Sequence, residues 1–212
     1  MGAFHGHSHD HGEPQFTGMS AAYKRRLWAV IAINAAMFIV EMTAGQLSRS
    51  QALQADALDF LADSLTYGIS LAAIGASLRT RATVALMKGL SLSAMGLWVF
   101  GATLYRVFVL GVPEAGVMGA IGFLALIANV VSVLLLIAYK DGDSNIRSVW
   151  LCSRNDAIGN VAVMIAAAGV WGTATGWPDL IVAAIMACLF LSSSFLIIRQ
   201  AWAERATVTQ YT

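Results

Sequence analysis

Two pairs of metal-binding side chains lie inside apolar stretches of this sequence: Asp59 with Asp63, and Cys152 with Asp156. The members of each pair are four residues apart, so on a helix they project from one face, one turn above the other. Aspartate oxygen and cysteine thiolate are both zinc ligands, and structural zinc sites are usually tetrahedral. The sequence therefore predicts a four-ligand metal site shared by two helices.

The apolar surroundings of these aspartates indicate a functional role. A carboxylate at the centre of a bilayer costs roughly 2.5–3.5 kcal/mol on insertion scales, so an intramembrane aspartate is a candidate site residue by default. Asp56 is a further candidate, either as an accessory ligand or as a hydrogen-bonding group between helices. Asn155 is the next candidate ligand if Cys152 only fills space, which is how we interpret Cys188.

A site of this composition selects its ion and responds to pH. A thiolate ligand favours soft ions such as zinc and cadmium over magnesium, calcium and manganese. Metal binding must displace protons from the carboxyl and thiol groups. A bound Zn²⁺ or Cd²⁺ can therefore be exchanged for H⁺, and no prosthetic group is expected.

The composition assigns the chain to the membrane. It is 58% hydrophobic with a mean hydropathy of +0.70, and only 12% of its residues are charged, against roughly 25% in soluble domains. A membrane span needs about 20 residues, and each of six apolar stretches in the sequence is long enough. They cover residues 27–47, 52–78, 84–110, 116–139, 145–171 and 178–202. We expect an all-α integral membrane bundle of six transmembrane helices, with the lipid bilayer as its surroundings and no nucleic-acid partner.

Basic residues predict how the bundle is oriented. If both termini are cytoplasmic, only Arg49 and Arg106 lie outside, and the positive-inside rule is satisfied. The basic residues then inside are Lys24, Arg25, Arg26, Arg79, Arg81, Lys88, Lys140, Arg147, Arg199 and Arg205. The expected organisation is a cytoplasmic His-rich tail (residues 1–23), a six-helix transmembrane domain (24–203) and a short cytoplasmic tail (204–212).

The depth of the two pairs predicts that they meet. Asp63 and Asp156 each lie eleven residues into their stretch, which is about 16 Å into a hydrocarbon core about 30 Å thick. The two spans run in opposite directions. Their polar faces can therefore form one midplane site that opens alternately to either side.

All four histidines of the chain lie near its start, at His5, His7, His9 and His11. The run can be an expression tag, but its alternation with Gly, Ser and Asp is unlike one. His-rich tracts of this kind often bind metal. We interpret it as a weak accessory site that collects metal ions.

These residues resemble the cation diffusion facilitator family, which exports divalent transition metals. The resemblance rests on residues 34–41, on residues 50–63 and on Cys152 to Asp156, and it covers nearly the whole membrane part. The family's second helix carries His or Asp, three residues, then Asp, which matches Asp59 and Asp63. Its fifth helix carries His, three residues, then Asp, which Cys152 and Asp156 match, followed by Asn160 where the family often has a small polar residue.

The sequence departs from the family's pattern in two ways. Cys152 stands where the family usually has histidine, which bears on metal preference. The family usually continues into a cytoplasmic domain after the sixth span, so the chain resembles a short form that lacks this domain. The resemblance implies a homodimer, which would then be held by the membrane helices.

The predicted function is export of Zn²⁺, and also Cd²⁺, from a bacterial cytoplasm across the cytoplasmic (inner) membrane by proton antiport. The protein would then be a multi-pass transporter and not an enzyme. A membrane metal sensor or assembly subunit without transport is one alternative. An intramembrane aspartyl protease is another, although such enzymes take their two carboxylates from different helices, in motifs that are missing here.

Overall fold

The computed structural model describes residues 20–72, 78–109, 111–139 and 144–210, which form six long helices. They are α1 (Ala21–Ser48), α2 (Gln51–Ala72), α3 (Leu78–Phe108), α4 (Ala115–Leu136), α5 (Ser144–Thr173) and α6 (Trp177–Gln210), with a short 3₁₀ turn, η1 (Ile137–Tyr139), after α4. The described residues contain no strand, and the predicted all-α class is confirmed.

Five of the six helices are long and apolar enough to cross a membrane, and the chain is a multi-pass membrane protein. The exception, α2, carries three aspartates within eight residues, which lowers its hydropathy. It contacts each of the other five helices. The other helices thus surround the polar residues of α2.

The surface and interior of the bundle have the composition that lipid requires. Large apolar side chains such as Trp171, Phe108 and Leu47 are highly exposed, whereas many buried positions are Ala, Gly, Ser, Asn, Asp or Glu. In lipid, helices associate through close packing of small residues and through polar contacts rather than through apolar burial. The helices therefore direct their polar residues toward one another.

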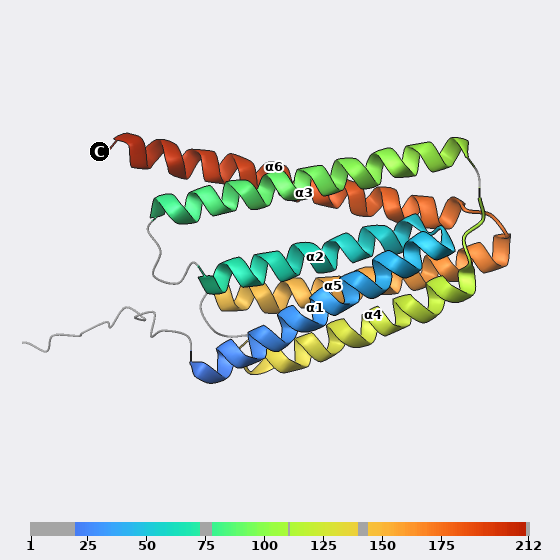
Figure 1. Ribbon diagram of the computed structural model, residues 1–212, viewed down its shortest axis with the longest axis horizontal. Coiled ribbons are helices and arrows are strands. Elements are labelled where there is room, and N and C mark those ends of the chain that lie inside the picture. The colour runs from blue at the N-terminus through green and yellow to red at the C-terminus, as the bar shows by residue number, and fades with distance from the viewer. Residues whose placement is uncertain (1–19, 73–77, 110, 140–143, 211–212) are drawn as a thin grey trace, which may run out of the picture.

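The helices alternate in direction and form two groups (Figure 1). One group contains α1, α2, α4 and α5, and the other is the pair α3 and α6, which make the most extensive contact in the structure. Gly89 and Gly96 allow this contact, because a Cβ at Gly89 would lie 2.7 Å from Cγ1 of Ile198. The hydroxyl of Ser194 on α6 donates to the Gly89 carbonyl (3.0 Å) and also contacts the hydroxyl of Ser93.

A tight hairpin joins α1 to α2. Arg49 ends α1 in a left-handed conformation (φ 60°). Gly45 of α1 lies so close to α2 that a Cβ at this position would be 3.0 Å from the backbone nitrogen of Gln54. The Gln54 side-chain amide donates to the carbonyls of Gly45 (3.2 Å) and Ser50 (3.0 Å). This hairpin fixes the register of the two helices.

The first turn of α2 is held by a residue from α6. The carboxylate of Asp179 accepts from the Ser50 hydroxyl (2.6 Å) and from the backbone amides of Gln51 (2.8 Å) and Ala52 (3.0 Å). The Ser50 hydroxyl in turn accepts from the amide of Leu53 (3.0 Å). Free amides at a helix start attract a carboxylate, so Asp179 ties the start of α2 to α6.

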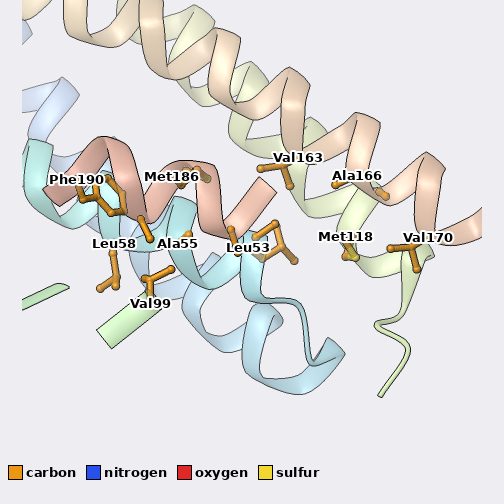
Figure 2. Close-up of a cluster of buried hydrophobic side chains, with 14 of the residues drawn as sticks. Leu53, Ala55, Leu58, Val99, Met118, Val163, Ala166, Val170, Met186 and Phe190 are labelled. Carbon is orange, nitrogen blue, oxygen red and sulfur yellow. The ribbon is translucent and has the colours of Figure 1, made fainter. Parts of the chain in front are cut away.

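A buried apolar cluster joins the two groups of helices (Figure 2). Its side chains come from α2, α3, α4, α5 and α6. Those labelled in the figure are Leu53, Ala55, Leu58, Val99, Met118, Val163, Ala166, Val170, Met186 and Phe190. The cluster packs α2 and α5 into one body, which positions the candidate site.

Candidate metal centre

One small pocket inside the bundle is lined by aspartates from two helices. Asp59 and Asp63 come from α2 and Asp156 comes from α5, and Phe60 and Asn129 complete the lining. The pocket is a narrow gap between the helices, and all three aspartates are half-buried. The structure therefore brings together three of the four residues that the sequence indicated as ligands.

Asp59 and Asp156 lie within hydrogen-bonding reach of one another across the contact between α2 and α5. Two ionised carboxylates offer only acceptors, so this contact requires a proton or a cation between them. Elsewhere in the lining, Oδ2 of Asp63 accepts a hydrogen bond from the Tyr67 hydroxyl, one turn away on the same helix. Tyr67 is fully buried and orients this carboxylate.

The carboxylates share a pocket but do not form a closed ligand shell. Within the part of the chain that the structure describes, no group of three or more His, Cys, Asp or Glu side chains is placed to hold a metal ion. Cys152 lies in α5 one turn before Asp156, but its side chain is outside the described residues. A chelate formed by all four side chains therefore remains a prediction.

The other candidate residues lie elsewhere. Asp56 is buried and faces Glu41 of α1 rather than the pocket lining. Asn155 is exposed and accepts a long hydrogen bond (3.4 Å) from Arg154. Cys188 is exposed on α6 and is not a buried packing residue. The histidines of the tail, His5, His7, His9 and His11, lie outside the described residues.

Sequence reasoning missed three residues of this region: Asn129, Tyr67 and Glu41. Asn129 and Glu41 are buried polar side chains within apolar helices, and the reasoning that drew attention to Asp59 applies to them equally. Tyr67 offered no comparable signal, because a tyrosine in a span is an ordinary apolar residue until its hydroxyl has a partner.

Residues 27–204 match the family model of the cation efflux transmembrane domain. The chain belongs to this cation efflux family. The resemblance to the cation diffusion facilitators is thereby confirmed.

Several curated bacterial members of the cation efflux family are similar to this chain. The metal cation efflux system protein CzcD of Cupriavidus metallidurans is 27% identical over 211 residues, which cover 94% of this chain and 64% of the relative. The zinc transporter ZitB of Escherichia coli K12 is 30% identical over 210 residues, covering 92% and 64%. ZitB of Pectobacterium atrosepticum is 27% identical over 208 residues, covering 92% and 62%. This chain thus spans slightly less than two thirds of the length of these relatives, and the predicted multi-pass protein of a bacterial inner membrane is confirmed.

Proposed function

We propose that the chain exports Zn²⁺ from the cytoplasm in exchange for protons, and that it also carries Cd²⁺. The observation that carries this proposal is the pocket in which carboxylates of α2 and α5 meet inside an apolar bundle. The family of this chain is named for cation efflux, and two relatives of the chain are named zinc transporters. These names favour a transporter over the intramembrane protease considered above.

Exchange follows from the chemistry of the pocket. A cation that enters between Asp59 and Asp156 replaces the proton that their contact requires, and the pair takes up a proton again when the cation leaves. Cys152 supplies the fourth ligand, with Asp63 held by Tyr67 as the third carboxylate. Because α2 and α5 run in opposite directions, a rocking motion of the helices exposes this pocket to one side at a time.

Flux in proteoliposomes tests the proposal. The purified protein should move zinc and cadmium when a pH gradient is imposed, and dissipating the gradient should stop net transport. Asp59→Asn and Asp156→Asn should each abolish flux, because each removes a charged ligand. Glu114 is an exposed acidic residue at the start of α4. The Glu114→Gln variant is therefore the matched control and should transport normally.

Two results would contradict this function. Zinc flux that ignores the pH on the far side would exclude proton exchange. Zinc binding without any flux would favour the metal sensor or assembly subunit instead.

The remaining parts of the proposal concern the whole protein. We assign metal collection to the His-rich tail (residues 1–23), transport to residues 24–203, and a cytoplasmic location to both ends of the chain. The homodimer would form through the membrane helices.

A further inference from the structure

A second pair of carboxyl groups is buried beside the pocket. Glu41 of α1 is 0% exposed and Asp56 of α2 is 2% exposed. Their carboxyl groups lie within hydrogen-bonding reach of each other, because the tight hairpin sets these two positions level. Neither residue lines the pocket of Asp59, Asp63 and Asp156.

This pair lacks the donors that buried carboxylates need. Neither Oε1 nor Oε2 of Glu41 has a hydrogen-bond partner among the described residues, and the same holds for Oδ2 of Asp56. A carboxylate offers only acceptors, so the two groups cannot satisfy each other. Buried polar groups without partners are costly and rare in folded proteins. Three such oxygens in one place indicate a binding position for a positively charged species.

The pair of Glu41 and Asp56 also lies next to the pocket along the axis of α2. Asp56 precedes Asp59 by three residues, a rise of about 4.5 Å along α2, toward the end of the helix that is tied to Asp179. With the predicted orientation this is the side away from the cytoplasm. A cation that leaves Asp59 and Asp156 in the outward direction therefore meets Glu41 and Asp56 next.

We propose that Glu41 and Asp56 form a second subsite for the transported divalent cation, on the release side of the pocket. This inference rests on the proposed function. The subsite offers carboxylate oxygens and no thiolate, so it binds zinc and cadmium more weakly and discriminates less between soft and hard ions. A weakly binding subsite next to the tight site allows the ion to leave in two short steps, first from the tight site to the subsite and then from the subsite to the outside.

Zinc-binding stoichiometry tests the subsite without any transport. The protein used is the full chain in detergent with His5, His7, His9 and His11 replaced by Ala, so that the tail does not contribute. Calorimetric titration should reveal two zinc ions per chain, one tight and one at least tenfold weaker. Glu41→Gln and Asp56→Asn should each remove the weak ion and change the tight affinity less than threefold.

Matched variants keep the result interpretable. Glu114→Gln removes an exposed carboxylate and should retain both ions. Glu41→Asp keeps the charge and should weaken the second ion without removing it. If Glu41→Gln does not fold, as judged by its thermal unfolding, Asp56→Asn decides the question from the other helix.

The outcomes separate this subsite from the proposed function. Two ions bound by either neutral variant, or a single ion bound by the parent protein, would overturn the subsite and leave a shared proton as the occupant of the pair. Two ions bound by a parent protein that transports nothing would overturn the proposed function and support the subsite.

Discussion

At the scale of single residues, Cys152 is the position that we expect to decide metal preference. It stands one turn before Asp156 on α5, where the family it resembles usually has histidine. We expect Cys152→Ser to lower cadmium affinity more than zinc affinity, because cadmium is the softer ion. The loss for cadmium should exceed the about 10–100-fold that removal of a hydrogen-bonding partner of a ligand costs. Cys152→His should restore zinc binding.

Equilibrium binding of both ions measures this effect. Cys188→Ser is the control, because Cys188 is exposed on α6 and should not influence either ion. If zinc and cadmium bind Cys152→Ser as they bind the parent, the thiol is a packing residue.

Tyr67 is expected to act on the same metal site through the carboxylate of Asp63. Its hydroxyl donates to Asp63 while its ring packs with Tyr23 and Leu27, so Tyr67→Phe removes the donor and keeps the packing. We expect zinc affinity to fall about tenfold, the lower end of the range for groups that orient a ligand. Tyr105→Phe, at an exposed position on α3, is the matched control in the same titration. Unchanged zinc affinity would show that the hydroxyl does not orient Asp63 for the ion.

At the scale of helices, Asp179 holds the start of α2 in place. It accepts three hydrogen bonds from the first residues of α2 and the residue before them, although it belongs to α6. Asp179→Ala leaves these buried donors without an acceptor, which should lower the free energy of unfolding by about 1–3 kcal/mol. Denaturant titration in detergent measures this loss.

Glu114→Ala is the control for Asp179, because Glu114 precedes α4 without any side-chain cap. Its stability should stay within about 0.5 kcal/mol of the parent, as for most surface substitutions. Equal losses in the two variants would show that the bonds of Asp179 contribute nothing specific.

At the scale of the whole molecule, the two groups of helices predict which parts move together. The pair α3 and α6 carries none of the residues that line the pocket, and the two helices pack closely at Gly89 and Gly96 of α3. Ser93 and Ser194 contact each other across this pair. We expect a disulfide made by Ser93→Cys with Ser194→Cys to leave zinc flux within about twofold of the reduced protein, because packed helices shift as units rather than deform.

Oxidised and reduced forms of the double variant are compared in proteoliposomes, with Ser93→Cys alone as the control for oxidation. Arrested flux in the cross-linked form, restored by a reductant, would mean that α3 and α6 must slide past each other during transport.

Local properties of the sequence determined the all-α membrane fold. Each span must satisfy its own backbone hydrogen bonds in lipid, so hydropathy and length identified the six helices without knowledge of their packing. The helical period also placed Asp59 above Asp63 on one face of α2. The helix assignment and the shared face of Asp59 and Asp63 both depend only on residues that are close in the sequence, within a few helical turns.

The depth of Asp63 and Asp156 in their spans predicted that α2 and α5 share one site, whereas the tertiary structure alone decided which individual polar groups are in contact. Asp59 meets Asp156, Glu41 meets Asp56, and the Asp179 carboxylate caps a helix that begins 128 residues earlier. These pairs depend on which helices are adjacent and at what register, and that choice is made by small residues such as Gly45 and Gly89. No local pattern encodes it, because the packing free energy of a helix face exists only once its neighbour is in place.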